Sequence, residues 1–218
     1  MKIGTIVLDG PKRLLFMSDL HYGHKNIIKM GNRPFLDVEG MNKWISKSLS
    51  EEIKKTDIVI DLGDMFWKTS EGEAIELISN INAGTRYKVL GNHDYRDLWS
   101  SDGFIRTTLF DTVCDILEFK VILGGVKYKV VCSHYPLLSW NHKSDGSINI
   151  HGHCHGNLDE FNKNSPDLRL DIGVDSIFCK QYGLGGIVVD FKNIIEQLKI
   201  KTGGLDFMTW AQTKCTEL

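Results

Sequence analysis

Side chains that can bind metal ions or transfer protons are grouped in five short blocks of this sequence. The blocks are Asp19-Leu20-His21, Gly63-Asp64, Gly91-Asn92-His93-Asp94, His134 and Gly152-His153-Cys154-His155. Nitrogen and oxygen donors without thiolates suit Mn²⁺, Fe, Zn²⁺ or Ni²⁺, and they exceed what Mg²⁺ usually takes from protein. The blocks offer more ligands than one ion with open positions can use. They therefore suggest two divalent ions that share a carboxylate.

Two such ions would leave the site with a net positive charge, because only Asp19 and Asp64 contribute negative charges to it. A positive site favours phosphate anions and a bound hydroxide. Two ions about 3.5–4 Å apart can hold a phosphoryl group and lower the pKa of a bridging water to about 7. The residue types thus favour hydrolysis of a phosphate ester.

Taken singly, most of the blocks have an ordinary structural explanation. Asp19 could cap a helix, Gly63-Asp64 could form a turn, and His134 beside Pro136 could be a hydrogen-bonded core histidine. Asp94 could orient His93, but we favour a role as the cap of the following helix. The functional interpretation depends on all five blocks occurring together.

A predicted β-strand precedes each block, and this pattern is what could bring the blocks together. The strands are expected at 13–17, 57–62, 86–90, 126–131 and 148–150. In α/β sheets, ligands bind beyond the carboxyl ends of the strands, where successive loops converge. We therefore expect the five blocks to meet at one place.

The remaining pattern predicts an α/β fold. Helices expected at about 41–55 and after the capping box of Ser70 and Glu73, with Gly84 at its end, alternate with the early strands. Such alternation is typical of a parallel sheet with crossover helices. Asp9-Gly10-Pro11 lies between apolar runs at 3–8 and 13–17 and predicts a hairpin.

The second half of the chain has more strands. A long hairpin is expected at 116–123 and 126–131, further strands at 168–172 and 187–191, and helices at about 192–200 and 205–213. We expect one domain over residues 1–218, with two sheets packed together and helices outside.

Composition narrows the class of protein. The chain has 218 residues, a formal net charge of −2 and five cysteines without a CxxC pair. The charge does not favour binding of long nucleic acid, and the cysteines indicate a reducing, cytoplasmic compartment. No run of 18 apolar residues predicts a membrane span. A small phosphorylated substrate is the expected partner; the sequence does not indicate an oligomeric state.

In their order and spacing, the five blocks resemble those of the calcineurin-like metallophosphoesterase superfamily, over residues 13–191. The segment Ser18-Asp19-Leu20-His21-Tyr22-Gly23-His24-Lys25-Asn26-Ile27-Ile28 further resembles a small bacterial and phage branch of phosphoesterases. The resemblance implies a four-layer α-β-β-α sandwich of two mixed sheets.

The resemblance also implies roles for individual residues. One ion would be held by Asp19, His21, Asp64 and His155, and the other by Asp64, Asn92, His134 and His153. Mn²⁺ is the preferred ion, with Fe, Zn²⁺ or Ni²⁺ as alternatives. A metal-bridging hydroxide would attack phosphorus, the amide of Asn92 would reach a phosphate oxygen, and His93 would protonate the leaving oxygen.

Substrate contacts outside the blocks are predicted more loosely. The expected candidates are His24, Arg33, Trp140 and His142, on loops at 24–40 and 138–147 that would shape the pocket together with a loop at 95–112. A plain surface role is the alternative for each. A structural hydrogen bond is favoured for His151, and Cys154 is expected to point away from the ions and be buried.

The leading hypothesis is an enzyme acting on phosphodiesters or phosphomonoesters, possible substrates being nucleotides and cyclic nucleotides. The alternative is a non-catalytic protein-binding scaffold that kept the fold, although such a protein would be expected to lose ligands or His93.

Overall fold

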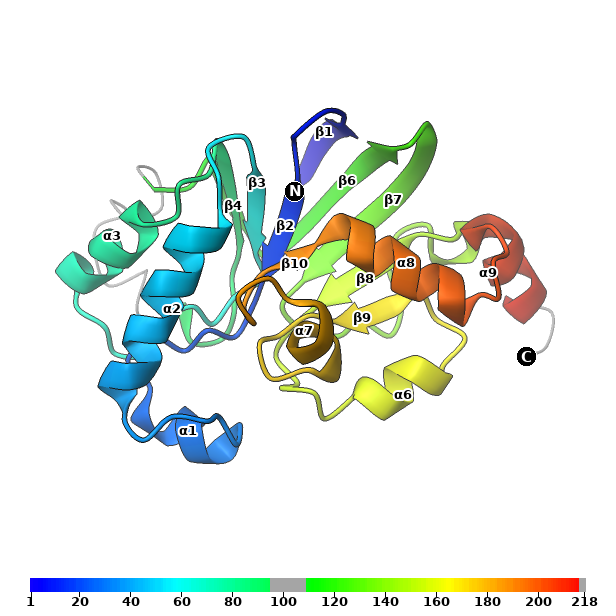
Figure 1. Ribbon diagram of the computed structural model, residues 1–218. Helices are drawn as coiled ribbons and strands as arrows, with labels where there is room; N and C mark the ends of the chain where they lie inside the picture. The colour runs from blue at the N-terminus through cyan, green and yellow to red at the C-terminus, as the bar shows by residue number, and fades with distance from the viewer. Residues whose placement is uncertain (95–108, 216–218) are drawn as a thin grey trace.

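The computed structural model of the chain describes residues 1–94 and 109–215. Two mixed sheets make up the strands of these residues (Figure 1). The first sheet has the order β1 (Lys2–Leu8), β6 (Ile116–Leu123), β7 (Val126–Ser133), β8 (Ile148–His151) and β9 (Arg169–Asp171). The second has the order β10 (Val189–Asp190), β2 (Leu14–Met17), β3 (Ile58–Asp61), β4 (Thr85–Val89) and β5 (Thr112–Cys114).

The strands β2, β3, β4 and β5 run parallel, as the alternating pattern of the first half predicts. Their crossover helix α2 (Val38–Glu52) begins at Asp37, whose carboxylate accepts the N–H of Gly40. The crossover helix α3 (Glu71–Ser79) begins with the predicted capping box of Ser70 and Glu73. It ends at Asn80 rather than at Gly84, which instead lies directly before β4.

The second sheet is apolar on both faces, so it lies in the middle of the molecule. Leu14 and Phe16 of β2 point into a core shared with the first sheet, to which α8 (Phe191–Lys201) also contributes. Leu15 and Met17 point to the opposite side, where α2 and α3 cover the sheet (Figure 1). The layering is that of the predicted sandwich.

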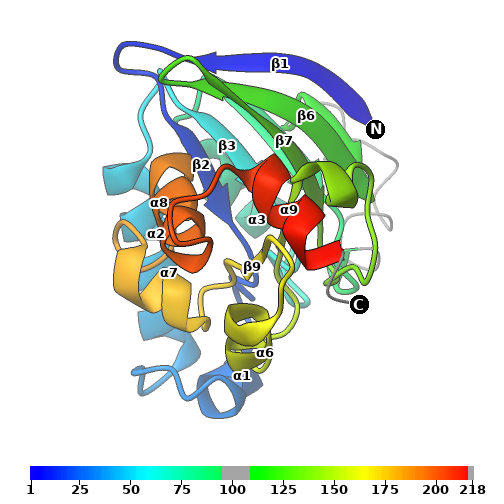
Figure 2. The same cartoon turned by 90° about the vertical axis from the view of Figure 1, so that its right-hand side faces the viewer.

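The hairpin predicted around Asp9-Gly10-Pro11 is wrong. β1 and β2 belong to different sheets, and β1 instead pairs in parallel with β6, as Figure 2 shows. Every residue of β2 is buried, so this strand needs neighbours on both sides and has β10 and β3. β1 is largely exposed and suits the edge of the first sheet. The hairpin of β6 and β7 forms in the expected register, with Leu123 opposite Val126.

The remaining helices lie close to the sheet ends or follow the last strand. They are α1 (Lys25–Met30), the 3₁₀ turn η1 (Lys143–Asp145), α6 (Asp159–Asn164), α7 (Ile177–Tyr182) and α9 (Phe207–Cys215). None of the helices in the described parts of the chain is both long and apolar enough to cross a membrane. Cys114, Cys132, Cys154 and Cys179 are free thiols.

Candidate metal centre

The loops that follow the strands meet through main-chain hydrogen bonds. The N–H groups of Asp19 and His21 donate to the carbonyls of Gly63 and Asp64, each at 3.0 Å, which joins the loop after β2 to the loop after β3. The N–H of Gly152 donates to the carbonyl of His134 at 3.0 Å, which joins the loops after β7 and β8. Strand ends from both sheets therefore contribute to one cluster of side chains.

Five of the predicted ligands have left-handed backbone conformations. The φ angles are 59° at Asp19, 51° at His21, 55° at Asp64, 67° at His153 and 49° at His155. A positive φ costs free energy in a residue with a side chain, and such residues gather at functional sites. All five residues belong to the close groups of donors that could hold a metal ion.

Two glycines leave the room that Asp19 needs. A Cβ atom at Gly173 would lie 2.6 Å from the Oδ2 of Asp19, and one at Gly152 would also collide with this carboxylate. The N–H of His153 donates to both oxygens of Asp19, at 3.1 and 3.0 Å. Asp19 is completely buried, and these main-chain contacts fix the orientation of its carboxylate.

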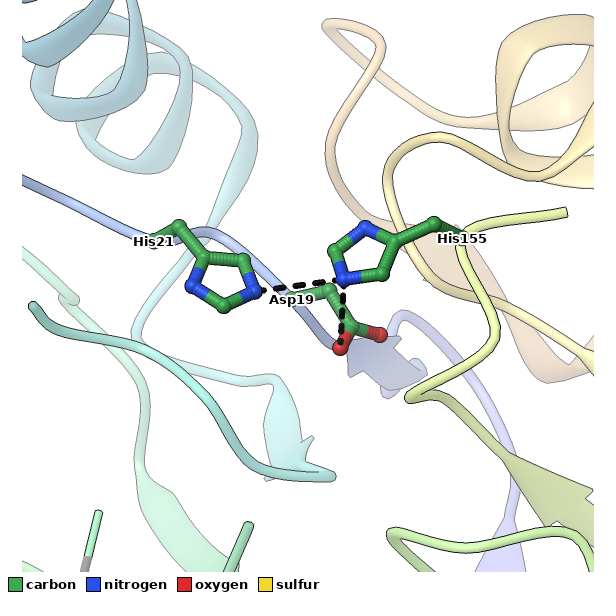
Figure 3. A group of neighbouring side chains, drawn as sticks. All are labelled: Asp19, His21 and His155. Atoms are coloured by element: carbon green, nitrogen blue, oxygen red, sulfur yellow. Dashed lines mark hydrogen bonds and ion pairs between the residues drawn. The ribbon is translucent and has the colours of Figure 1, made fainter. Parts of the chain in front are cut away.

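Asp19, His21 and His155 form the first part of the centre (Figure 3). The rings of the two histidines point toward each other, with the Nε2 atoms 3.3 Å apart. Two nitrogens bound at about 2.1 Å to one tetrahedral ion would be roughly 3.4 Å apart. The spacing therefore fits a metal ion between the rings, with Asp19 Oδ1 3.9 Å from the Nε2 of His155.

Asp64 belongs to both remaining parts of the centre. Its Oδ2 lies 3.8 Å from the Nε2 of His21 and 3.4 Å from the Nε2 of His134. His134 and His153 form one close group with Asp64, and the Oδ1 of Asn92 lies 3.2 Å from the Nε2 of His134. The donors are nitrogen and oxygen atoms, which fit two divalent ions on either side of Asp64.

Hydrogen bonds and burial prepare these side chains to bind cations. The carbonyl of Leu62 accepts the Nδ1–H of His134 at 2.8 Å, which leaves Nε2 to face Asp64. Burial lowers the pKa of His21 to about 2, so its ring is neutral. Burial also opposes the charged forms of Asp64 and His134, but their hydrogen bond outweighs it. The hydrogen bond between them lowers the pKa of Asp64 and raises the pKa of His134 to about 9.

His93 lies at the open side of this cluster. Its Nε2 is 3.7 Å from the Oδ2 of Asp64, and its side chain is 27% exposed. Its N–H donates to the Oδ1 of Asp64 at 2.9 Å. His93 also forms a close group with His21 and Asp64. The position suits a proton donor that borders solvent, and it also allows direct contact with an ion.

The structure places Arg33 differently from the expectation of a phosphate contact. Its guanidinium forms two hydrogen bonds with Asp175, at 2.9 and 2.8 Å, and others with the carbonyls of Asp19 and Leu20. A further N–H points to the sulfur of Met41 at 3.5 Å. All its donors are thus used inside the protein, and Arg33 supports the centre from behind rather than contacting a substrate.

Asp175 completes a chain of contacts that the sequence analysis missed. Its Oδ2 accepts the Nδ1–H of His155 at 2.7 Å, and Arg33 holds the same carboxylate. Burial opposes its charge, but His155 and Arg33 lower the pKa of Asp175. A carboxylate behind a metal-binding histidine fixes its tautomer and strengthens it as a ligand. Asp175 belongs to no motif in the sequence, so it is recognised only by its contact with His155 in the folded structure.

Asp94 also acts from behind the centre. Its carboxylate accepts the N–H groups of Gly91 and Asp64, at 2.8 and 2.9 Å, and pairs with Lys88 at 2.8 Å. Lys88 is completely buried and also pairs with Asp61. The residues after Asp94, where the helix that it was expected to cap would lie, are outside the described range. In the described part, Asp94 holds the loop of Asp64 against that of Asn92.

His151 has the structural role that the sequence favoured. It is buried, its Nδ1 bonds to the carbonyl of Gly152 at 2.8 Å, and its Nε2 meets the amide of Asn162 at 3.1 Å. Cys154 is half-buried rather than buried, and it forms a second close group with His151 and Asp171. Both oxygens of Asp171 accept main-chain N–H groups, from Gly156 and Gly173.

His24 is the predicted substrate contact that the structure brings next to the centre. Its ring stacks on Trp67 with centroids 4.1 Å apart, and it lies 5.3 Å from the ring of His21. The ring of Trp67 in turn meets that of His93 edge-on at 4.5 Å. Trp67 follows the second block by three residues, but it was not predicted to belong to the site.

Trp140 and His142 do not take the expected places over the pocket. The indole of Trp140 is buried, donates to the carbonyl of Ser147 and is covered by the ammonium group of Lys143. His142 is exposed and pairs with Asp145 at 2.6 Å. Their loop packs against α9 instead, because η1 and α9 are in contact. Most of the expected loop at 95–112 lies outside the described residues.

Known proteins resemble this chain along most of its length. The calcineurin-like phosphoesterase family matches residues 12–189. An uncharacterized protein from Methanocaldococcus jannaschii is 33% identical over 192 residues, which cover 87% of this chain and 94% of that protein. The gene 66 protein of Mycobacterium phage L5 is 28% identical over 180 residues, covering 74% and 86%.

A solved structure supports the fold separately. A protein of unknown function from Aquifex aeolicus superimposes with a TM-score of 0.61 at 20% identity, covering 85% of this chain and 98% of that one. The match of the family spans all five blocks, and the fold and the cluster of donors agree with it. The chain therefore belongs to the calcineurin-like phosphoesterase family.

Proposed function

We propose that this chain hydrolyses phosphodiesters or phosphomonoesters with two divalent metal ions, Mn²⁺ being the preferred one. The observation that carries the proposal is the position of Asp64, whose carboxylate belongs to two close groups of donors, one with His21 and His93 and the other with His134 and His153. Asp19, His21 and His155 would hold one ion with Asp64. Asn92, His134 and His153 would hold the other with the same carboxylate.

When bound, two such ions polarise phosphoryl oxygens and lower the pKa of a water molecule to about 7. The residues of the chain supply the rest. The amide N–H₂ of Asn92 can donate to a phosphate oxygen while its Oδ1 faces His134. His93 lies at the open side of the cluster, with its Nε2 near the carboxylate of Asp64. From there it would donate a proton to the leaving oxygen.

The direct test is hydrolysis of a bis-aryl and a mono-aryl phosphate by metal-stripped protein. Mn²⁺, Fe²⁺, Zn²⁺ and Ni²⁺ are added back separately, and kcat/KM is measured for both esters. We expect activity that depends on added metal, and the ratio of the two kcat/KM values gives the preference for diester or monoester. Protein that binds metal yet hydrolyses neither ester with any ion would favour the non-catalytic scaffold.

The role of His93 has its own test. For His93→Ala, we expect kcat to fall about a hundredfold or more for an alkyl ester, because its leaving oxygen needs a proton, and much less for an activated aryl ester. His142→Ala is the matched control, since this exposed histidine lies in the loop between β7 and β8 and pairs with Asp145. An equal loss with both esters, or loss of a bound ion, would assign His93 as a ligand instead.

A further inference from the structure

We propose that Lys88 is a positioning residue of the candidate metal centre, although its side chain is completely buried and is not a ligand. Its ammonium group holds the loops of Asp64 and Asn92 in the arrangement that binds two ions. The inference rests on the proposed two-metal function and extends it to a residue behind the ligands. Lys88 belongs to none of the five blocks.

The ammonium group of Lys88 lies between two carboxylates that are as completely buried as the lysine itself. It donates to the Oδ2 of Asp61 and pairs with the Oδ2 of Asp94 at 2.8 Å. Burial opposes the charge of the lysine, but the two carboxylates outweigh it and raise the pKa of Lys88. The lysine is therefore a buried cation, and its removal would leave its partners as unpaired buried charges.

Both carboxylates also hold the main chain of the loop after β3. The Oδ1 of Asp61 accepts the N–H of Gly63 at 3.1 Å. The carboxylate of Asp94 accepts the N–H groups of Asp64 and Met65, at 2.9 and 3.3 Å. Three successive N–H groups, with the bridging aspartate in the middle, are therefore held by the two partners of one lysine.

This loop needs support because its backbone is strained and crowded. Asp64 has a φ of 55°, and such a conformation persists only where the surrounding structure enforces it. A Cβ atom at Gly91 would lie 2.2 Å from the Oδ1 of Asp64, so the loop of Asn92 is in close contact with it. The N–H of Gly91 donates at 2.8 Å to the oxygen of Asp94 that pairs with Lys88. The same ion pair therefore holds both loops.

The pairing of the strands places Lys88 at this point. Asp61 is the last residue of β3, and its partner in the parallel register is Lys88 of β4. Both positions lie at the carboxyl ends of their strands, directly before the loops with the ligands. With a neutral side chain at position 88, Asp61 and Asp94 would repel each other. Their separation would move Asp64 and Asn92 apart, because the main chain of both loops is bonded to these carboxylates.

A second ion pair of the same sheet provides a matched control. Arg13 forms two hydrogen bonds with Asp57, at 3.0 and 2.5 Å, and Asp57 is buried. The two residues come directly before β2 and β3, at the ends of the strands opposite to the ligand loops. Loss of this pair should destabilise the sheet without moving a metal ligand.

The experiment measures Mn²⁺ binding to folded Lys88→Met, by calorimetry and by electron paramagnetic resonance. Methionine removes the charge and keeps an unbranched side chain. We expect the Mn²⁺ affinity to fall about tenfold or more, the scale of losing a group that orients a metal ligand. The signal of an exchange-coupled Mn²⁺ pair should give way to that of single ions, because Asp64 no longer lies between two sites. Arg13→Met should unfold at lower denaturant concentration but keep its affinity within about twofold, as for a change away from the site, together with the coupled signal.

A double variant, Lys88→Met with Asp61→Asn, serves if Lys88→Met does not fold, since it has one unpaired buried charge fewer. Its Mn²⁺ affinity should stay lowered, because Asp94 still lacks its cation. The inference is overturned if the folded Lys88 variants bind Mn²⁺ as tightly as Arg13→Met and keep the coupled signal, or if the unaltered protein shows no such signal. It is also overturned if neither Lys88 variant folds while Arg13→Met does, because Lys88 then serves the fold as a whole. Since binding is measured without a substrate, the result is separate from that of the hydrolysis assay.

Discussion

Four histidines have a left-handed backbone, and His142, in the loop before β8, is the one that does not belong to the candidate centre. His153 has a φ of 67° and forms a close group with the buried Asp64 and His134, from two other loops. His142 has a φ of 59°, but it is exposed and pairs with the nearby Asp145. Strain at a histidine is therefore not a sign of function by itself. What distinguishes the centre is that strained, buried donors from separate strands face one another.

The same contrast holds for the aromatic residues of the two regions. Trp67 stacks on His24 and touches His93, so its ring surface lies beside the donors. Trp140 is buried against its own loop and is held by Ser147 and Lys143. The first is placed to affect binding and turnover, the second to affect stability.

The largest effect should come from Asp64. Removing this carboxylate in Asp64→Ala takes a donor from both halves of the centre, so we expect both ions to be lost or misplaced. Activity should fall more than about a hundredfold. This loss is larger than the one expected when a residue that only hydrogen-bonds to a metal ligand is removed. Elemental analysis measures the bound metal; full occupancy in the variant would contradict the bridging position.

Asp175 should show a smaller effect of the same kind. Asp175→Asn keeps the shape but weakens the acceptor for the Nδ1–H of His155, and metal affinity should fall about 10- to 100-fold. Asp145→Asn, a change in the exposed loop of His142, is the matched control and should not alter metal affinity. Equal affinities for the two variants would mean that Asp175 does not support His155.

Metal binding should weaken as the pH falls. In the metal-free protein, burial opposes the charge of His134, but Asp64 and Asp19 outweigh it and raise the pKa to about 9. An ion binds only the deprotonated ring, so below this pH it must displace a proton. We expect the affinity of this half of the centre to fall about tenfold per pH unit below about 9. Calorimetry in buffers of different ionisation enthalpy measures the released proton; the absence of proton release would contradict the pairing of His134 with Asp64.

The smallest effect on turnover should come from changes in the loop of Trp140 and His142. Trp140→Ala should lower the free energy of unfolding by about 3 kcal/mol, because a buried indole is lost. At temperatures well below unfolding, kcat/KM should change less than about twofold for Trp140→Ala and His142→Ala, as for changes away from a site. Denaturant unfolding and steady-state kinetics separate these outcomes; a large loss of kcat/KM in His142→Ala would bring this loop back to the site.

The sequence could predict the donors because the strands position them. Asp19 and Asp64 each come shortly after a buried strand, and parallel neighbouring strands bring such positions to one edge of the sheet. The alternation of strands and helices was enough to indicate this arrangement. The family resemblance added the partition of the donors between two ions, which the structure leaves as a prediction.

Other features depend on contacts between distant segments, which no local pattern encodes. A turn at Asp9-Gly10-Pro11 suits both a hairpin and a step from one sheet to the other, and the second occurs. Arg33 and Asp175 are 142 residues apart and find each other only after folding. The polar residues around Trp140 in the sequence suggest an open loop, but the loop packs against α9 and the indole is buried.

The most direct test of the central claim is anomalous diffraction from crystals of the protein grown with Mn²⁺. We predict two peaks, both within coordinating distance of the carboxylate of Asp64, one next to His21 and His155 and the other next to His134 and His153. A single peak, or peaks only beside His151, Cys154 and Asp171, would contradict a two-metal centre at the strand ends.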